Sequence, residues 1–380
     1  MSAKKTILIL CDWFLPGYLA GGPIQSIVTL TQQLGLDIDF KIITTDRDFK
    51  SNAAYTNIKI NEWTQFEGRT VFYISPENMN EAFILKLIQH TKHDTIYLNS
   101  LFSKHFSINP LKWKSNGKIT SKLILAPRGM LGDGALSVKP LKKKLFLMYA
   151  QLIGLYKGIH WQSTSLEETE NIKKRIASTA SIIQVSNVPA ITHTCIAIEK
   201  KQGILRLCFI ARILEVKNLQ FAIQVLQEIK TANIILDIYG PKEDKMYWDI
   251  CFHNIRKLPN NIQCTYQGVL MPSQIANTIS KYHALFLPTH TENFGHIIVE
   301  TLQCSRPVII SNQTPWRHLE SINAGFDIDL QYKNKFVNAI EKLAQLNQTE
   351  FDAMSQASKT YINNELNIQD IKNKYIKLFS

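Results

Sequence analysis

At 380 residues the chain is too long for one ordinary hydrophobic core, which predicts two domains of about 150–200 residues each. Its composition, 45% hydrophobic and 19% charged, is typical of a globular protein and excludes a disordered one. The net charge is +12, and residues 1–200 carry 24 basic against 15 acidic residues (+9), which leaves +3 for the remainder. This excess favours an anionic membrane surface over nucleic acid as a partner, because no nucleic-acid recognition motif accompanies it.

Membrane and redox signals are sparse. No apolar run reaches the roughly 20 residues that a membrane-spanning helix needs. The six cysteines are scattered without a C-x2-C pair, so we expect buried thiols in a reducing compartment rather than disulfides or a zinc site. These features predict a cytoplasmic protein that is at most peripheral on the inner face of the cytoplasmic membrane.

Short apolar runs alternate with longer helical patterns along the whole chain, which predicts strands separated by helices. In the first half, strands are expected at 7–10, 40–44, 95–98, 122–125 and 181–185. In the second half, they are expected at 205–210, 234–239, 262–267, 284–287 and 308–310. Because strands that alternate with helices form parallel sheets covered on both faces, we predict an α/β protein with two Rossmann-like, doubly wound domains. Their bounds are placed at 1–190 and 200–362, and a final helical segment follows at 363–380.

A glycine pair lies in the first loop, where residues 12–23 join the first predicted strand to a helix. At the start of that helix, Gly21 and Gly22 can bring backbone N–H groups close to a phosphate. The loop lacks the G-x-G-x-x-G spacing, so it gives no support to a dinucleotide site. Two glycines are common in loops, and on their own they make only a candidate phosphate contact.

Arg128 follows the strand predicted at 122–125 and should face the ligand crevice of a doubly wound domain. A guanidinium there can stabilise negative charge that develops on a leaving phosphate, but it cannot act as a base at neutral pH. The alternative is that Arg128 only pairs with an acidic neighbour, and the sequence leaves both possibilities open.

A lysine cluster, Lys139 and Lys142 to Lys144, precedes an apolar helix predicted from Leu145 to Tyr156. Such a segment can lie on an anionic bilayer with its basic side toward the headgroups and its apolar side partly inserted. A core helix with a charged first turn is the alternative of equal weight.

Two basic residues mark the start of the second domain. Arg212 follows the strand predicted at 205–210, and Lys217 comes five positions later, where the next helix is expected to start. Both can reach the crevice at the carboxyl ends of the strands, where guanidinium and ammonium groups bind phosphate oxygens.

The most informative segment is 285–300, in which a buried strand ends at a proline and a polar loop leads into an amphipathic helix. Glu292 lies in the loop, Gly295 at the junction, and Glu300 eight positions after Glu292. Free backbone N–H groups and the positive end of the helix therefore lie beside two carboxylates. Amides suit an anion and carboxylates accept hydrogen bonds from sugar hydroxyls, so the segment fits a nucleotide-sugar.

This segment resembles the E-x7-E signature of the retaining glycosyltransferase family 4, usually E-x-F-G-x4-E. Four residues match it position for position: Glu292, Phe294, Gly295 and Glu300. The basic pair resembles the family's G-R-x4-K-G pattern, with Ala211 and Asn218 in place of the two glycines. In the loop after residue 125, Arg128 stands where many members have a histidine.

The resemblance implies the GT-B fold, with the donor site in the cleft between the domains and the C-terminal helix crossing back onto the first domain. Candidate catalytic residues are Glu292, Arg212, Lys217 and Arg128. Candidate donor-binding residues are Gly21, Gly22, Asn293, Phe294, Gly295, Glu300, Gly240 and Val269. In the family's arrangement Arg212, Lys217 and Gly22 would hold the diphosphate and Glu300 the ribose hydroxyls. Glu292, together with the backbone of 293–295, would hold the donor sugar.

The activity implied is a retaining, metal-independent hexosyl transfer from a nucleotide-sugar, with a UDP-sugar favoured. The acceptor would be a glycan or a lipid-linked molecule in bacterial cell-surface polysaccharide biosynthesis, such as capsule or O-antigen. The alternative is a catalytically inactive, glycosyltransferase-like scaffold subunit, whose donor site should be eroded. The presence of Arg212, Lys217, Glu292 and Glu300 counts against that alternative.

We expect no metal and no cofactor. A D-x-D pattern occurs three times, but only Asp46 and Asp48 follow a predicted strand. Since Arg212 and Lys217 already supply the positive charge that a metal would bring to a diphosphate, a metal is not needed.

Overall fold

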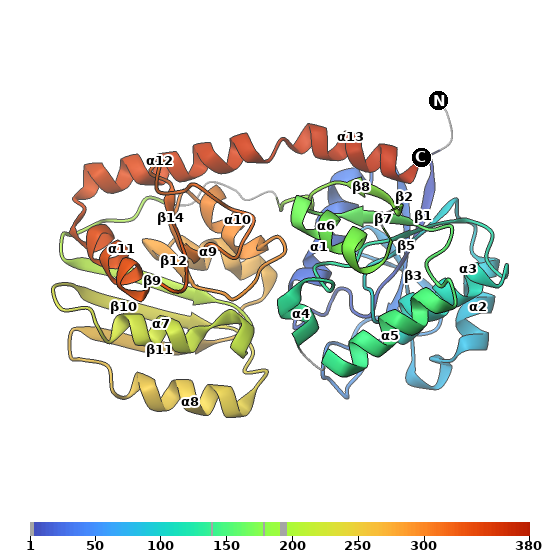
Figure 1. Ribbon diagram of the computed structural model, residues 1–380, viewed down its shortest axis with the longest axis horizontal. Coiled ribbons are helices and arrows are strands. Elements are labelled where there is room, and N and C mark those ends of the chain that lie inside the picture. Colours follow the sequence, from blue (N-terminus) through green and yellow to red (C-terminus); the bar gives the residue numbers. More distant parts are fainter. Residues whose placement is uncertain (1–3, 138–139, 178, 191–195) are drawn as a thin grey trace. The chain divides into compact units, whose positions relative to one another are not determined.

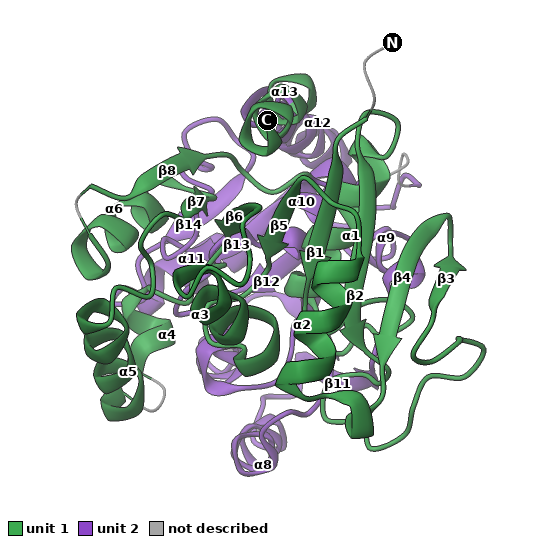
Figure 2. Ribbon diagram, turned by 90° about the vertical axis from the view of Figure 1, so that its right-hand side faces the viewer, with its two compact units in different colours: residues 1–188, 368–380 green, residues 189–367 purple. Residues whose placement is uncertain are grey.

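The computed structural model describes residues 4–137, 140–177, 179–190 and 196–380. The chain divides into two compact units (Figures 1 and 2), unit 1 with residues 1–188 and 368–380, and unit 2 with residues 189–367. The last helix, α13 (Ile368–Phe379), therefore belongs to the N-terminal unit. The helix before it, α12 (Gln348–Glu365), runs through the domain boundary predicted at residue 362.

Unit 1 is built on an eight-stranded sheet of order β3-β4-β2-β1-β5-β6-β7-β8. From the neighbouring β1 and β5 the chain adds strands outward in both directions, which is the doubly wound arrangement. Only β3 runs antiparallel to its neighbour. The strands are β1 (Thr6–Leu10), β2 (Asp39–Thr45), β3 (Trp63–Phe66), β4 (Arg69–Ile74), β5 (Thr95–Leu98), β6 (Lys122–Leu125), β7 (His160–Ser163) and β8 (Ser181–Gln184).

The helices of unit 1 lie in the connections between these strands, except α13, which ends the chain, as Figure 1 shows. They are α1 (Gly22–Leu34), α2 (Glu81–His90), α3 (Asn109–Ser115), α4 (Asp133–Ser137), α5 (Pro140–Leu152), α6 (Leu166–Arg175) and α13, with short turns η1 (Pro76–Asn78) and η2 (Lys104–Ile108). A helix long and apolar enough to cross a bilayer does not occur in the described parts of either unit.

Unit 2 has a six-stranded sheet of order β11-β10-β9-β12-β13-β14, parallel throughout. Its strands are β9 (Ile204–Ile210), β10 (Asn233–Tyr239), β11 (Ile262–Gly268), β12 (Ala284–Leu287), β13 (Val308–Ser311) and β14 (Gly325–Ile328). Its helices are α7 (Leu219–Leu226), α8 (Lys245–Ile255), α9 (Ile275–Ile279), α10 (His296–Gln303), α11 (Lys333–Gln345) and α12, with short turns η3 (Glu215–Lys217) and η4 (Pro272–Gln274). The prediction of two doubly wound sheets is thus confirmed.

Four strands were not predicted. β7 and β14 read His-Trp-Gln-Ser and Gly-Phe-Asp-Ile and lack the apolar run that marks a buried strand. β3 and β4 form a hairpin through Glu67 and Gly68, both at positive φ (46° and 74°). The prediction of a wholly parallel first sheet is therefore wrong at this edge.

The helix predicted to reach Tyr156 ends at Leu152. Gly154 has φ 64°, its N–H donates to the carbonyl of Gln151 (3.0 Å), and that of Leu155 donates to Ala150 (2.8 Å). A glycine at positive φ, followed by a residue whose N–H bonds to the carbonyl five positions earlier, commonly ends a helix. It separates the apolar residues after it from the helix.

Four cysteines are free as predicted: Cys11, Cys208, Cys251 and Cys264. Cys304 is disulfide-bonded, so the prediction that the cysteines form no disulfide is wrong at this position. Scattered spacing does not reveal which thiols the fold brings together.

Candidate active site

The carboxyl ends of β9 and β12 are the place in unit 2 where a ligand site is expected. These two strands are neighbours, and from them the chain adds β10 and β11 on one side and β13 and β14 on the other. In open α/β sheets the crevice at this reversal of strand order is the usual binding place. The loops after β9 and β12 carry Lys217 and Glu292.

Lys217 and Glu292 form an ion pair between these two loops, with 2.5 Å between Nζ and Oε2. Both side chains are largely buried, at 16% and 19% exposure, so this pair is held more firmly than a surface pair. The two loops are joined by their backbones, since the carbonyl of Val216 accepts hydrogen bonds from the Thr289 hydroxyl (2.9 Å) and the His290 N–H (2.9 Å). The sequence named both charged residues but not their pairing.

Asn218 explains how the chain turns from Lys217 into the next helix. It has φ 60° and ψ 40°, the left-handed region that glycine and asparagine tolerate best. Its side-chain amide donates to the carbonyl of Pro288 (3.0 Å). Lys217 itself lies in η3, two residues before α7 begins at Leu219, so the prediction that it starts the helix is wrong.

Arg212, the second predicted cation, lies after β9 and pairs with Glu243, at 2.9 Å between Nη1 and Oε2. Glu243 stands in the loop after β10, which is joined to the loop after β9 by a hydrogen bond from Ile213 N–H to the Pro241 carbonyl (2.9 Å). The sequence analysis missed Glu243 because no spacing rule links it to Arg212. The pairing follows only from the neighbouring positions of β9 and β10.

Gly240 and Val269, two of the predicted donor-binding residues, follow the carboxyl ends of β10 and β11. Gly240 has φ 135°, and a Cβ there would lie 1.8 Å from the carbonyl oxygen of Ala211. The Gly240 N–H donates to the carbonyl of Gly268 (2.8 Å), and Val269 is 41% exposed. Both predicted residues thus lie on the same sheet edge as Arg212.

The loop before α10 is fixed by an aromatic contact and a glycine. Gly295 is the N-cap of α10, at φ 75° and ψ 62°. The indole N–H of Trp316 donates to the Phe294 carbonyl (2.6 Å), and the two rings lie 5.6 Å apart. The glutamate loop, which includes Asn293, therefore enters the helix in one defined conformation.

Glu300 lies more than one turn inside α10 and is only 8% exposed. No hydrogen bond or ion pair joins its carboxylate to any residue that the structure describes. Burial raises the pKa of Glu300 to about 7. A buried carboxylate that no protein group satisfies is a candidate ligand contact.

In unit 1, the glycine pair lies as predicted at the start of α1, with Gly21 as the N-cap at φ 68° and Gly22 as the first helical residue. This start follows β1, next to β5 at the reversal of strand order in the first sheet. The side-chain amide of Asn99, directly after β5, donates to the Pro23 carbonyl (3.1 Å). Sequence inspection could have found Asn99, since it is the first residue after a predicted strand.

Arg128 donates to three uncharged groups. Its Nε donates to Asn99 Oδ1 (2.7 Å), one terminal N–H to the Tyr97 hydroxyl (2.7 Å), and the other to Asn187 Oδ1. The predicted alternative of an acidic partner is not seen among these bonds. Because none of these three partners is charged, the guanidinium charge is not neutralised at the carboxyl edge of the first sheet. That this charge stabilises a leaving phosphate stays a prediction.

The Asp46 and Asp48 carboxylates are engaged elsewhere. Asp46 pairs with the neighbouring Arg47 (2.8 Å), and Asp48 accepts hydrogen bonds from three backbone N–H groups, of Tyr18, Leu19 and Phe49. Within the described ranges no three histidine, cysteine, aspartate or glutamate side chains gather as a metal site would require. The expectation that activity needs no metal remains to be tested.

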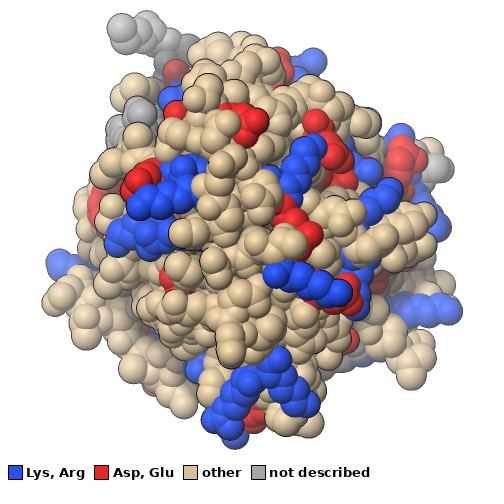
Figure 3. Space-filling view, turned by 90° about the vertical axis from the view of Figure 1, so that its left-hand side faces the viewer, with Lys and Arg blue, Asp and Glu red and all other residues tan. Residues whose placement is uncertain are grey.

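Charge is mixed on the face of the molecule shown in Figure 3, where basic and acidic side chains lie interspersed. The surplus of basic residues, +12 over the whole chain, is therefore not gathered on that face.

Comparisons with known proteins agree with this geometry. Residues 197–360, which make up most of unit 2, match the family model described as glycosyl transferases group 1. No curated protein sequence matches the chain.

Several solved structures have the same architecture over nearly the whole chain. Sucrose-phosphate synthase from Thermosynechococcus elongatus is 14% identical, with 99% of this chain and 98% of that one covered at a TM-score of 0.74. HepE from Anabaena, in complex with UDP and glucose, is 12% identical, with 98% and 99% covered at 0.70. A variant of TarM from S. aureus, in complex with Fondaparinux, alpha-GlcNAc-glycerol and UDP, is 12% identical, with 99% and 100% covered at 0.69. At such identities these likenesses establish the fold, which is GT-B.

Proposed function

We propose that this chain is a retaining, metal-independent glycosyltransferase of family 4. It would move a sugar from a nucleotide-sugar, with UDP-sugars favoured, to a glycan or lipid-linked acceptor in bacterial cell-surface polysaccharide biosynthesis. The observation that carries this proposal is the buried Lys217–Glu292 pair at the strand-order reversal of a group 1 glycosyltransferase domain. The UDP named with HepE and TarM supports the choice of donor.

The roles of the residues follow from their chemistry. Lys217 and Arg212 would bind the diphosphate and stabilise the charge that it gains as the bond to the sugar breaks. Each now pairs with a carboxylate, Glu292 or Glu243, so a diphosphate must compete with those carboxylates for the cations. Glu292 would then be released to accept hydrogen bonds from the hydroxyls of the donor sugar.

A retaining transfer of this kind needs no side-chain base. The bond between the sugar carbon and the diphosphate oxygen breaks, the acceptor oxygen bonds to that carbon on the same face, and its proton passes to the leaving phosphate. The protein then acts by position and charge. Glu300 would accept hydrogen bonds from the ribose, which gives its unsatisfied carboxylate a partner.

A screen of donor hydrolysis across UDP-, GDP- and dTDP-sugars tests the proposal. Turnover of at least one donor supports it. The scaffold alternative predicts no turnover of any donor and no thermal shift with any nucleotide. The complete set of Arg212, Lys217, Glu292 and Glu300 does not favour that alternative.

The Lys217→Ala variant is expected to bind UDP about 10- to 150-fold more weakly and to lose activity in proportion. Loss of a charge-assisted contact costs about 1.5–3 kcal/mol. Isothermal titration with UDP measures the loss, and the exposed Lys245→Ala, on α8, is the matched control. Activity of Lys217→Ala within twofold of the native chain contradicts the assignment.

Activity is expected to survive EDTA. Because Arg212 and Lys217 supply the positive charge, removal of divalent ions should leave turnover within about twofold, well below the tenfold change that 1.4 kcal/mol would cause. If EDTA abolishes turnover and Mg²⁺ or Mn²⁺ restores it, the metal-free reading is wrong and Asp46 and Asp48 must be reconsidered.

We further propose that unit 1 binds the inner face of the cytoplasmic membrane through α5. Four side chains along one face of this helix are at least 57% exposed: Leu141, Leu145, Met148 and Leu152. At 100° per residue they form one apolar ridge, with Lys142 and Lys144 on its two sides. Exposed leucines flanked by lysines are typical of a helix that lies in the interface of an anionic bilayer.

Lys143 differs from its neighbours. Its ammonium group donates to the carbonyl of Ala135 (2.5 Å) and lies 5.5 Å from the Phe102 ring centroid. Lys143 is therefore less available to lipid headgroups than Lys142 and Lys144, and the joint action of the three lysines stays a prediction. Lys139 lies outside the described residues.

Replacement of Lys142 and Lys144 by Gln is expected to weaken binding to anionic vesicles by about 30-fold, at about 1 kcal/mol for each lysine. Vesicle co-sedimentation measures this, and higher salt should weaken the native chain likewise. The control Lys173→Gln/Lys174→Gln removes the same charge from α6. The membrane proposal fails if the α5 variant sediments as the native chain does.

A further inference from the structure

Arg128 occupies a turn position that normally belongs to glycine, asparagine or aspartate. Residues 127–130 follow β6 and form a four-residue turn, in which the Met130 N–H donates to the Pro127 carbonyl (3.1 Å). The two central residues, Arg128 and Gly129, both have positive φ, at 55° and 78°. Glycine adopts this conformation at little cost, but an arginine in the left-handed region strains the backbone. Such strain persists only where the surroundings hold it, and it clusters at functional sites.

The backbone of this turn is held by Glu168, a buried residue in the first turn of α6. One carboxylate oxygen, Oε1, accepts a hydrogen bond from the Gly129 N–H (2.5 Å). The other, Oε2, accepts two hydrogen bonds from Thr164, one from its N–H (2.7 Å) and one from its hydroxyl (2.7 Å). The contact follows from the order of the sheet, because the turn comes after β6, α6 comes after β7, and these two strands are neighbours.

These three hydrogen bonds explain why a glutamate is buried here. A buried charge costs free energy and is tolerated where hydrogen bonds satisfy it. A glutamine would suffice for Thr164 alone, because its single amide oxygen can accept both bonds. Its NH₂ group would then face the Gly129 N–H, donor against donor. Of these two side chains, only the ionised carboxylate satisfies Thr164 and the turn together.

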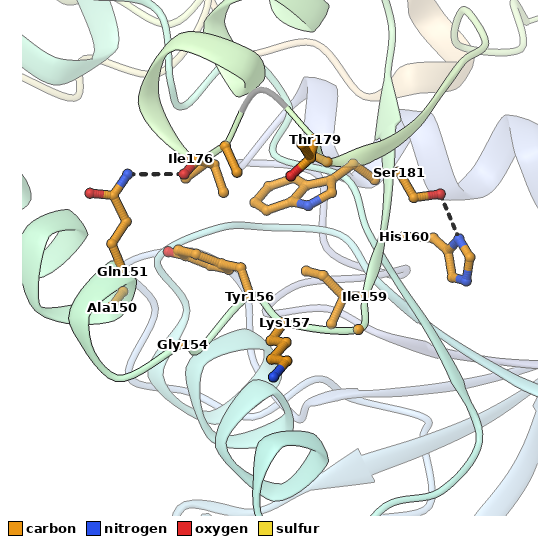
Figure 4. Close-up of a pocket in the computed structure, with 14 residues that line it drawn as sticks. Ala150, Gln151, Gly154, Tyr156, Lys157, Ile159, His160, Ile176, Thr179 and Ser181 are labelled. Carbon is orange, nitrogen blue, oxygen red and sulfur yellow. Dashed lines mark hydrogen bonds between the residues drawn. The ribbon is translucent and has the colours of Figure 1, made fainter.

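Helix α6 is also fixed at its far end, so Glu168 stands on a rigid element. The Gln151 side chain of α5 donates to the Ile176 carbonyl, directly after α6 (3.0 Å), a bond drawn as a dashed line in Figure 4. Arg175, in the last turn of α6, pairs with Asp133, the first residue of α4. Groups on a rigid element are held more precisely than groups on a loop, which suits Glu168 to fixing the turn.

We propose that Glu168 is a positioning residue for the transfer reaction. By holding the Gly129 N–H, it keeps Arg128 in the strained conformation from which the guanidinium reaches its three hydrogen-bond partners. Glu168 acts through Arg128 and not on the substrate itself. The inference rests on the proposed function and on the predicted role of Arg128, which is to stabilise negative charge on the leaving phosphate.

The kinetics of Glu168→Gln test this proposal with a donor found in the hydrolysis screen. The kcat should fall about tenfold or more, because Arg128 acts in the transition state. The KM should change less than about threefold, because Arg212 and Lys217 bind the diphosphate. The matched control is Glu170→Gln, the same substitution at an exposed position of α6, and it should leave both constants unchanged. A kcat of Glu168→Gln within twofold of the native chain overturns the proposal.

Glu168→Asp separates the contact from the charge. Aspartate keeps the negative charge in this region, but its side chain is one methylene shorter. Its carboxylate should stay with the neighbouring Thr164 and lose Gly129, so we expect the same fall in kcat as in Glu168→Gln. A native kcat in Glu168→Asp would show that the charge alone suffices and would overturn the positioning role. If Glu168→Gln does not fold, Glu168→Asp decides in its place.

A measurement without turnover distinguishes this proposal from the proposed function. Phenylglyoxal modifies arginine side chains, and mass spectrometry of the digested chain gives the rate at Arg128. In both Glu168 variants this rate should rise about fivefold or more, because the released turn frees the guanidinium. The rate at Arg69, whose side chain is 12% exposed, should not change.

The two proposals therefore fail separately. An unchanged labelling rate at Arg128 overturns the positioning role of Glu168, whether or not any donor is turned over. If the native chain turns over no donor but the labelling rate rises in the variants, the proposed function fails and the hold of Glu168 on Arg128 stands.

Discussion

Glu300→Gln is expected to stabilise the protein at pH 8 and at the same time to weaken UDP binding tenfold or more. The buried carboxylate has a pKa of about 7 against a usual 4.5, so the folded chain binds the Glu300 proton more tightly than the unfolded chain does. The folded state therefore loses stability as pH rises from about 4.5 to about 7, by about 3 kcal/mol in total. An isosteric neutral amide removes most of that cost.

The pH dependence separates this account from a merely structural role. At pH 5 Glu300 is protonated in the folded state, so the stabilising effect of Glu300→Gln should fall to about 1 kcal/mol or less. Thermal unfolding at pH 5 and pH 8 measures this, and Glu320→Gln, at an exposed pair with Lys342, is the control and should change little.

The pH dependence of UDP affinity is the second measurement that tests the role of Glu300. If the ionised carboxylate accepts hydrogen bonds from the ribose hydroxyls, UDP binds more tightly to the native chain as pH rises through about 7. The Glu300→Gln variant should not show this increase in affinity. Titration of the UDP phosphate itself affects both chains and cancels in the comparison. A Glu300→Gln variant that is less stable at pH 8, or that binds UDP as the native chain does, contradicts the assignment.

The sequence predicted those parts of the fold that leave a local hydrophobic signal. Strands such as β5 (Thr95–Leu98) and β12 (Ala284–Leu287) are buried along their whole length, so an uninterrupted apolar run identifies them. β7 (His160–Ser163) joins the same kind of sheet with a polar sequence. Its position depends on its neighbours β6 and β8, and a local pattern does not contain that information.

In the candidate site, too, some residues could be predicted from the sequence and others only from the fold. Glu292, Lys217 and Arg212 stand at strand ends, where residue type and position suffice to suggest a role. Their partners follow from which strands are adjacent. Glu243 meets Arg212 because β10 lies beside β9, and Asn187 meets Arg128 through the loops that follow β6 and β8.

Burial was the property that the sequence indicated least well. Glu300 was placed correctly on the helix after the loop, but its 8% exposure depends on packing by several elements of unit 2. The raised pKa of Glu300 follows from that burial and not from any neighbour in the sequence. The same holds for α5, where periodicity predicts an amphipathic helix but does not show which face is left uncovered.

Gly240→Ala is expected to cost about 3 kcal/mol of stability or more and to abolish UDP binding. The added Cβ would lie 1.8 Å from the Ala211 carbonyl oxygen. Because this oxygen belongs to the backbone, no change of side-chain rotamer can relieve the clash. Relief requires β9 and β10 to separate at their carboxyl ends, and Arg212 follows directly on that edge.

The matched control is Gly268→Ala, at φ 97° but with nothing within 4 Å of its added Cβ. It carries the conformational cost alone, about 1–2 kcal/mol. Thermal unfolding and UDP titration of both variants give the comparison. Equal losses in the two would show that backbone conformation, and not the contact with Ala211, decides the effect.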